Sequence, residues 1–515
     1  MNPTAFDDQP NRLLIMDTTL RDGEQTSGVA FTDTEKLSMA RILLENVQVD
    51  RIEIASARVS EGEFLGAGKV LAWAAEKGYL DRVEILGFVD GDISLKWISN
   101  AGGKVLNLLC KGSLKHVTEQ LRKTPEQHLA DIRKVIALAT EMGIRVNVYL
   151  EDWSNGMRNS REYVHTMISG LRYEKIDRFM LPDTLGILNP DETYAYCREM
   201  LDSYPDLAFD FHAHNDYDLA VANVYQALKA GIRCIHTTVN GLGERAGNVP
   251  LSSVIATATD HLNMVSSVNE TMLNRISKVV ESFSGIRIPG NKPLIGDFVF
   301  TQCSGIHADG DSKNKLYFNE LLPERFGRIR KYALGKTSGR ANIKKNLEDL
   351  GIDLDSDSLR KVTDRIIELA DQKENVSSED LPYIVADVLS SQAIEEKIKV
   401  RNYSISHAMG LRPTASVSIE IGGNEYQEIS SGDGQYDAFM RALRKIYDSL
   451  GKPFPALTDY VVTIPPGGKT DALVETVITW QNGHEFKTRG LDSDQTTAAI
   501  KATVKMLNII ENNYA

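Results

Sequence analysis

Short apolar segments and longer amphipathic segments alternate eight times along roughly the first 250 residues of this chain of 515 residues. The apolar segments are rich in β-branched residues, as buried parallel strands are, and the segments between them have the apolar spacing of helices. The predicted strands are 13–17, 51–55, 83–89, 104–109, 145–151, 178–183, 209–214 and 235–240. This alternation predicts an α/β fold with a (β/α)₈ TIM barrel. A doubly wound open sheet remains the alternative.

Polar residues follow most of these strands at their carboxyl ends, the edge at which such barrels build their active sites. Arg21 and Asp22 follow the first predicted strand, and His212 and His214 end the seventh. The other candidates on this rim are Tyr149, Glu151, Asp152, Asp183, Thr184, Asn215, Asp216, Asn240, Glu244, Arg245 and Asn248. We therefore expect the active site at the carboxyl ends of the strands.

The segment His212-Ala213-His214 is the most informative part of this rim. Side chains two positions apart on a strand point to the same face, so both imidazoles can reach one metal ion. Asp22 is the candidate oxygen ligand, because strands one, seven and eight are neighbours in a closed barrel, and Asn248 can add a carbonyl oxygen. Such a set suits Mn²⁺, Zn²⁺ or Co²⁺ and, less typically, Mg²⁺. The alternative is a pair of hydrogen-bonded core histidines.

Three further segments carry weaker signals. GLGERAG at 241–247 fits a dinucleotide-binding fingerprint, but the acidic Asp260 falls in a predicted helix and not at the end of the next strand. PPGGKTD at 465–471 contains Gly-Lys-Thr but lacks the first glycine of a phosphate-binding loop. Cys303, four residues before His307, could be a nucleophile, although we interpret it as a buried structural thiol.

The chain beyond the predicted barrel divides into two further parts. Residues 291–388 form a predicted linker, in which 303–318 is expected to be a loop carrying His307 and Asp309, and 340–385 is expected to be helical. Residues 389–515 contain two similar halves, each of strands followed by one helix, which predicts a duplicated α+β regulatory or dimerising domain. The predicted domains are therefore 1–290, 291–388 and 389–515.

Charge and hydropathy exclude several classes of partner. The 58 basic and 71 acidic residues give a net charge of −13, and no basic run forms a local patch, so we expect no nucleic-acid partner. No apolar run approaches the roughly 20 residues of a membrane span, and the polar first residues do not resemble a signal peptide. We therefore expect a cytoplasmic protein. The four cysteines are far apart, which favours neither disulfides nor a thiolate zinc site.

Four motifs carry a resemblance to a known family. They are TLRDGEQ at 19–25, HAHND at 212–216, NGLGERAGN at 240–248 and HADGD at 307–311. Over essentially its whole length the chain resembles the isopropylmalate and citramalate synthase family, metal-dependent TIM-barrel acyltransferases that condense acetyl-CoA with a 2-oxoacid. Within the family it is most similar to the citramalate synthases, on segments such as EILGFVDG and NVYLEDWSNG.

The resemblance implies a metal site and a ketone-activating group. Asp22, His212, His214 and Asn248 would hold a divalent metal that binds the 2-oxoacid and polarises its ketone. Arg21 would stabilise the alkoxide that develops on the keto oxygen.

The resemblance also implies groups that handle protons and acetyl-CoA. Glu151 would join the acid–base network, and Thr184 would bind the substrate carboxylate. His307, with Asp309 and Tyr317 nearby, would help to deprotonate the acetyl methyl group of acetyl-CoA, reaching the barrel of the partner subunit in a homodimer. The resulting enolate would attack the ketone, and hydrolysis of the thioester would release CoA.

Substrate choice rests on Leu86, Leu109 and Tyr149, which are placed at the ends of strands three, four and five. In the citramalate synthases that the chain resembles, these positions form a tight apolar pocket around the methyl group of pyruvate. Such a pocket would clash with the isopropyl group of 3-methyl-2-oxobutanoate. A roomier pocket would still accept pyruvate, with a loss of only about 1–3 kcal/mol of binding free energy per missing methylene. Pyruvate is therefore favoured. A 2-isopropylmalate synthase is the main alternative, and a metal-dependent lyase or aldolase is a lesser one.

The resemblance extends to an effector pocket in the C-terminal domain, where isoleucine would act as a feedback inhibitor. The matching residues are Tyr436, Asp437, Tyr460, Ile464, Thr470, Val474 and Gln495. Two positions depart from the family pattern: Lys315 stands where Asn is expected, and Ser493 stands where Pro is expected.

Overall fold

The computed structural model describes residues 11–350, 352–371, 397–463 and 474–512, together with residues 376, 381, 384, 385 and 388. The chain forms two compact units. The barrel unit contains the residues up to Thr301 and Phe318–Arg330, and the C-terminal unit contains Gln302–Tyr317 and the residues from Lys331 onward.

The barrel unit is a closed parallel barrel whose eight strands follow one another in sequence order. The strands are β1 Leu14–Asp17, β2 Arg51–Ser56, β3 Val83–Phe88, β4 Val105–Lys111, β5 Arg145–Glu151, β6 Phe179–Asp183, β7 Phe209–Ala213 and β8 Cys234–Thr237. β8 pairs with β1 from Cys234 opposite Leu14 to Thr237 opposite Asp17, which closes the ring. The predicted TIM barrel is thus confirmed, and the doubly wound alternative is excluded.

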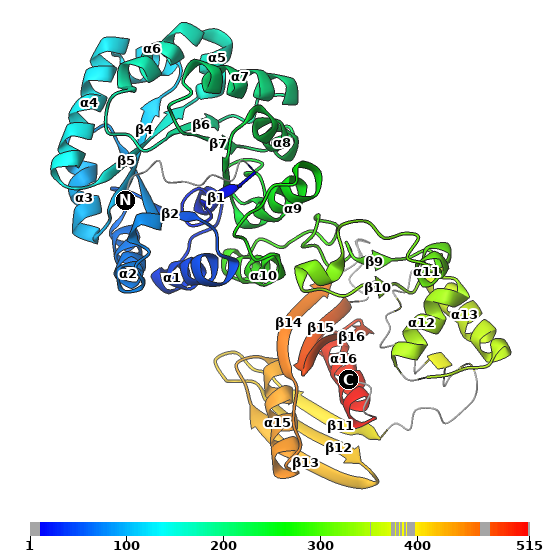
Figure 1. Ribbon diagram of the computed structural model, residues 1–515. Helices are drawn as coiled ribbons and strands as arrows, with labels where there is room; N and C mark the ends of the chain where they lie inside the picture. The colour runs from blue at the N-terminus through cyan, green and yellow to red at the C-terminus, as the bar shows by residue number, and fades with distance from the viewer. Residues whose placement is uncertain are drawn as a thin grey trace. The chain divides into compact units, whose positions relative to one another are not determined.

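Helices surround the ring of strands (Figure 1). They are α1 Asp33–Arg41, α2 Glu61–Lys77, α3 Ile93–Ala101, α4 Pro125–Glu141, α5 Trp153–Asn159, α6 Arg161–Leu171, α7 Pro190–Ser203, α8 Ala220–Ala230, α9 Leu251–Leu262 and α10 Leu273–Ser284. Local sequence sets several of their starts: α1, α4 and α7 each begin with a capping box, in which the cap and third residues satisfy each other's backbone N–H groups. Their apolar faces pack on the outward-facing strand residues in one large core.

The inside of the barrel is unusually rich in charge for a space that branched apolar side chains normally fill. Arg51 on β2 donates to Glu84 on β3 at 2.6 Å and to Asp210 on β7 at 2.5 Å, and all three side chains are buried. Burial raises the pKa of Asp210, but Arg51 and Arg178 outweigh burial and hold this pKa well below its usual range. Loss of one partner from such a buried pair costs about 3–5 kcal/mol, because the other charge is left uncompensated.

A second set of buried polar groups lies across strands β2, β4 and β5. Glu53 accepts a hydrogen bond from Nδ2 of Asn107 at 2.7 Å, and Oδ1 of Asn107 accepts one from Asn147 at 2.8 Å. Glu53 has no exposed surface, so its carboxylate depends on these donors and on those that reach it from the end of β1.

The segment between the barrel and the C-terminal domain contains β9 Thr301–Gln302, α11 Gly305–Ser312, β10 Lys331–Tyr332, α12 Arg340–Asp349 and α13 Ser356–Asp371. The helices α12 and α13 agree with the helical prediction for 340–385 over the residues that the structure describes. The prediction of a loop over 303–318 is wrong for α11. Its glycines serve close packing: a Cβ at Gly305 would lie 2.5 Å from Cα of Gly339, and one at Gly310 would lie 2.4 Å from the Tyr317 ring.

The C-terminal domain has the predicted duplicated pattern of three antiparallel strands followed by a helix. Its elements are β11 Ile398–Ser406, β12 Thr414–Ile421, β13 Asn424–Ser431, α15 Gln435–Ser449, β14 Ala456–Thr463, β15 Val474–Asn482, β16 His484–Asp492 and α16 Gln495–Glu511. The two halves share one apolar core. Across the described part of the chain, every helix is too short or too polar to cross a membrane.

Candidate active site

Asp22, His212 and His214 come together at the carboxyl ends of β1 and β7. Their potential ligand atoms all lie within 4.8 Å of one another, and the three side chains are buried. Nε2 of His212 is 3.4 Å from Oδ2 of Asp22, and the imidazole rings of His212 and His214 are 5.0 Å apart between centroids. The strand alternation that places both imidazoles on the inner face thus brings them to the carboxylate that follows β1.

Buried atoms without partners show that this cluster suits a metal ion. Among the described residues, Nδ1 of His212, Nδ1 of His214 and Oδ1 of Asn248 have no hydrogen-bond partner. Burial lowers the pKa of both imidazoles, and this effect exceeds the opposing influence of Asp22, so both rings are neutral near pH 7. Burial raises the pKa of Asp22, but Arg21 and the imidazoles outweigh burial and keep the carboxylate ionised. Neutral imidazoles, a carboxylate and an amide oxygen are a donor set for a divalent cation.

The loop NGLGERAGN after β8 positions Asn248 through its glycines. Gly243 and Gly247 have φ values of 153° and 83°. A Cβ at Gly243 would lie 2.2 Å from Nδ2 of Asn248, and one at Gly247 would lie 2.0 Å from the carbonyl oxygen of Gly241. Nδ2 of Asn248 donates to Asp22 and to the Leu242 carbonyl, both at 3.0 Å. The glycines that resemble a dinucleotide fingerprint therefore make room for Asn248 beside the cluster.

Arg21 lies beside the cluster, and hydrogen bonds to two carboxylates fix its guanidinium. Its Nε donates to Glu53 at 2.6 Å, and its Nη1 donates to Asp22 at 2.9 Å. The same Glu53 oxygen accepts a hydrogen bond from the hydroxyl of Thr18 at 2.7 Å. Burial alone would lower the pKa of Arg21, but Glu53 and Asp22 raise it, so the guanidinium stays charged.

Glu151 and Thr184 lie on the rim at the ends of β5 and β6. Glu151 is half-buried and forms an ion pair with Lys111 at the end of β4. The Thr184 hydroxyl accepts a hydrogen bond from the backbone N–H of Asp152 at 2.8 Å, and its own O–H can still donate. Both residues thus present polar atoms at the carboxyl edge of the barrel.

Leu86, Leu109 and Tyr149 form one apolar cluster inside the barrel, together with Leu14, Met16, Met180 and Cys234. Leu109 and Tyr149 are opposite each other in the register of β4 and β5. The Tyr149 ring meets the His212 ring edge-on at 6.1 Å between centroids, so the apolar cluster adjoins the candidate metal ligands.

His307, Asp309 and Tyr317 belong to the C-terminal unit, on α11 and in the turn after it. The His307 and Tyr317 rings are 4.2 Å apart between centroids, and Nδ1 of His307 is 3.0 Å from Oε1 of Gln302. Asp309 pairs with Lys313 at 2.8 Å. Lys315 has a φ of 56°, a left-handed conformation in which the expected asparagine is favoured over lysine. Cys303 is exposed, so the prediction of a buried thiol is wrong.

The predicted effector residues lie in the C-terminal domain. The rings of Tyr436 on α15 and Tyr460 on β14 are 5.4 Å apart between centroids, and the Tyr436 hydroxyl is 2.7 Å from that of Thr503. Asp437 pairs with Arg441 at 2.9 Å. Val474 begins β15 and Gln495 begins α16. Ile464 and Thr470 lie outside the described residues.

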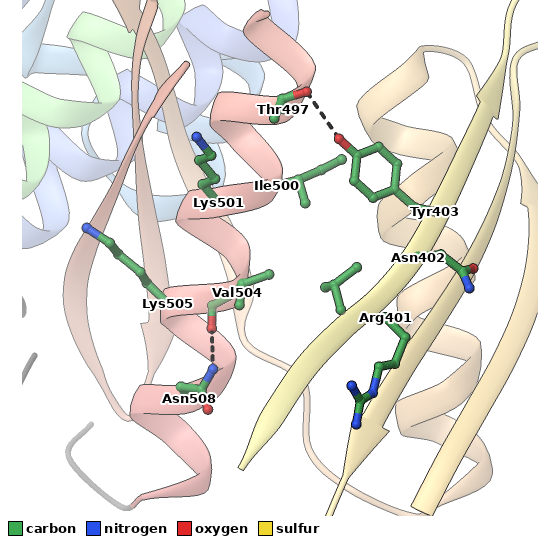
Figure 2. A pocket seen from close by; sticks show the side chains of 10 residues that line it. Arg401, Asn402, Tyr403, Thr497, Ile500, Lys501, Val504, Lys505 and Asn508 are labelled. Carbon is green, nitrogen blue, oxygen red and sulfur yellow. Dashed lines mark hydrogen bonds between the residues drawn. The ribbon is translucent and has the colours of Figure 1, made fainter. Parts of the chain in front are cut away.

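A groove of about 670 Å³ lies elsewhere in this domain, between β11 and α16 (Figure 2). Tyr403 of β11 spans it and lies 3.1 Å from the hydroxyl of Thr497 on α16. The ten residues that line the groove are all different from the predicted effector residues. The groove and the predicted effector site are therefore distinct places in the described part of the domain.

Three residues near the site are missing from the sequence-based candidates: Glu53, Lys111 and His236. Arg51 and Glu53 stand two positions apart in an otherwise apolar strand, a pattern that places charge on the inner face. That pattern could have indicated Glu53. Lys111 is found only once β4 pairs with β5, and His236 only once the closed barrel places β8 across from β5.

The position of Asn248 yields a test of the metal site. Gly243→Ala should lower the affinity for Mn²⁺ about tenfold, because the new methyl group displaces the Asn248 side chain. Gly143→Ala is the matched control. Gly143 has a φ of 67° and nothing within 4 Å of an added Cβ, so this variant has the backbone strain of an alanine at positive φ but no steric clash. Calorimetric titration with Mn²⁺ measures both. Equal affinities in the two variants would contradict this role of the loop.

Comparison with known proteins gives three family matches. Residues 12–280 match the HMGL-like family, residues 294–374 match the homocitrate synthase post-HMGL domain-like family, and residues 375–511 match the LeuA allosteric (dimerisation) domain.

Curated relatives match over nearly the whole chain. A putative (R)-citramalate synthase of Methanopyrus kandleri is 33% identical over 90% of this chain and 89% of its own. A probable 2-isopropylmalate synthase of the same organism is 35% identical over 97% of this chain and 98% of its own. The (R)-citramalate synthase of Methanocaldococcus jannaschii is 32% identical over 97% of this chain and 99% of its own. The chain is therefore an enzyme of the HMGL-like family, among relatives that are citramalate and 2-isopropylmalate synthases.

Proposed function

We propose that this enzyme is an (R)-citramalate synthase: an acyltransferase, acting in the cytoplasm, that condenses acetyl-CoA with pyruvate and releases citramalate and CoA. The observation that carries the proposal is the buried cluster of Asp22, His212 and His214, with Arg21 beside it and the apolar cluster that contains Tyr149 next to His212. The named relatives support the reaction class, since they include both citramalate and 2-isopropylmalate synthases.

The metal cluster and Arg21 would act on the 2-oxoacid. Asp22, His212, His214 and Asn248 would hold the divalent ion, with Mn²⁺, Zn²⁺, Co²⁺ and Mg²⁺ as candidates. When bound, the ion supplies Lewis acidity to the ketone. Arg21, kept charged and oriented by Glu53, would stabilise the negative charge that develops on the keto oxygen.

The rim residues would orient the acid and move protons. The Thr184 hydroxyl, which already accepts from the Asp152 backbone, would donate to the substrate carboxylate. Glu151, which pairs with Lys111, would exchange protons at the rim.

The acetyl group would be activated by residues of the C-terminal unit. His307, whose ring lies 4.2 Å from that of Tyr317 between centroids and whose helix also carries Asp309, would take a proton from the acetyl methyl group. We propose that it serves the barrel of the other subunit in a homodimer. The match of residues 375–511 to a dimerisation domain supports this arrangement.

Pocket size would decide which 2-oxoacid is used. Leu86, Leu109 and the phenol of Tyr149 fill the space beside His212, which favours a methyl group over an isopropyl group. The second candidate function is 2-isopropylmalate synthase, because a relative of that name is 35% identical to the chain.

Release of CoA from acetyl-CoA tests the proposed reaction. We expect kcat/KM with pyruvate to exceed that with 3-methyl-2-oxobutanoate by more than about tenfold. EDTA should abolish turnover and Mn²⁺ should restore it. The turnover rate of His212→Asn should be more than about 100-fold below that of the wild type. His165 lies on α6, outside the ring of strands, so the control variant His165→Asn should keep the turnover rate of the wild type. Preference for the branched acid would make the enzyme a 2-isopropylmalate synthase, and no CoA release with either acid would overturn the synthase proposal.

We also propose that isoleucine is a feedback inhibitor bound near Tyr436, Asp437 and Tyr460. The support is the pair of adjacent tyrosine rings, with the Asp437 carboxylate, now paired with Arg441, next to Tyr436 in the chain. Tyr460→Ala should raise the isoleucine concentration for half-inhibition at least about tenfold, through loss of one wall of the site. Tyr426→Ala, which alters a half-buried tyrosine of β13, is the control. Inhibition by leucine in place of isoleucine would contradict the assignment.

A further inference from the structure

A chain of buried hydrogen bonds connects the interior of the barrel to the wall of the substrate pocket. The hydroxyl of Tyr149 on β5 is 2.8 Å from Nδ1 of His236 on β8, and Nε2 of His236 is 3.2 Å from Oδ2 of Asp210 on β7. The same Asp210 oxygen accepts from Nη2 of Arg51 at 2.5 Å. All four residues are buried, so the chain is shielded from water.

The charge of Asp210 sets the direction of these hydrogen bonds. Oδ2 of Asp210 already accepts from the Arg51 guanidinium, which can only donate, so Nε2 of His236 carries the proton and donates to the same oxygen. In the neutral ring Nδ1 is then an acceptor, and the Tyr149 hydroxyl donates to it. The phenol of Tyr149 is thereby directed across the barrel to β8.

The Tyr149 ring lies between the apolar cluster and the candidate metal ligands. It meets His212 edge-on, and the Arg21 guanidinium lies over it at 5.9 Å from the ring centroid. Its other neighbours are the apolar residues Leu86 and Leu109. A shift of this ring would change the space beside the metal ligands without changing the ligands.

The same residues could also be considered as a second metal site. Asp210, Cys234 and His236 have ligand atoms within 4.8 Å of one another. However, Arg51 already donates to Asp210 and, at 2.9 Å, to the sulfur of Cys234, and burial raises the pKa of that thiol above its usual range. A cation therefore fills this place already, and the arrangement serves to position side chains.

We propose that His236 is a positioning residue that, anchored by Asp210 and Arg51, fixes the phenol of Tyr149 and thereby sets the largest 2-oxoacid side chain that the enzyme accepts. The proposal rests on the proposed 2-oxoacid condensation. It assigns substrate selection to a residue outside the candidate metal-ligand set, whose ring meets that of His212 edge-on at 5.5 Å between centroids.

Two substitutions at one position separate the two bonds of His236. In His236→Asn the amide takes the place of Nδ1 and can keep the bond to Tyr149, whereas in His236→Gln it takes the place of Nε2 and can keep only the bond to Asp210. Tyr149→Phe removes the hydroxyl alone and retains the ring. The ratio of kcat/KM for pyruvate to that for 2-oxobutanoate is measured for each variant and for the wild type, with KM and kcat reported separately.

The proposal predicts a particular pattern in these ratios. His236→Gln and Tyr149→Phe should lower the ratio about tenfold, mainly through KM, and the double variant should add nothing further. His236→Asn should stay within about twofold of the wild type. An unchanged ratio in Tyr149→Phe, or equal shifts in both His236 variants, overturns the proposal. Failure of the proposed function is seen separately, as a wild type that turns over no 2-oxoacid.

Discussion

The burial of charge inside the barrel is the constraint on which the site depends. A carboxylate without a partner is very costly in this environment, so each acidic residue of the interior must meet a cation or several hydrogen-bond donors. Arg51 satisfies Asp210 and Glu84, while Arg21 and Asn107 satisfy Glu53. The outcome is that Arg21 cannot move away from the site without depriving the buried Glu53 carboxylate of its paired cation. Pairing requirements within the barrel thereby hold the candidate catalytic residues of the rim in place.

The candidate metal ligands and the proposed substrate-selecting residues are located on different strands. The candidate metal ligands and Arg21 come from the ends of β1 and β7 and from the loop after β8. The apolar wall comes from β3, β4 and β5. A change in the wall can therefore alter the accepted 2-oxoacid while the activating groups stay as they are. The relatives named as a putative citramalate synthase and a probable 2-isopropylmalate synthase match the chain at 33% and 35% identity.

The sequence predicts much of this architecture because its signals are local. Strand alternation and capping residues place all eight strands within a few residues, and the spacing of His212 and His214 fixes their common face. The contacts of Lys111 and His236 are not local, since their partners lie 40 and 87 residues away and meet them only in the closed ring. The glycines of α11 led to the wrong prediction of a loop, because close packing and not turn formation requires them.

The central claim is that Asp22, His212 and His214 hold the ion to which the 2-oxoacid binds. Pulsed electron paramagnetic resonance of the Mn²⁺-loaded enzyme, with ¹³C-labelled pyruvate added, tests it most directly. The account predicts ¹⁴N couplings from two imidazoles, one of which is lost in His214→Ala, and a ¹³C coupling that appears with pyruvate. Bound Mn²⁺ without imidazole nitrogen couplings, or without a ¹³C coupling from pyruvate, would contradict it.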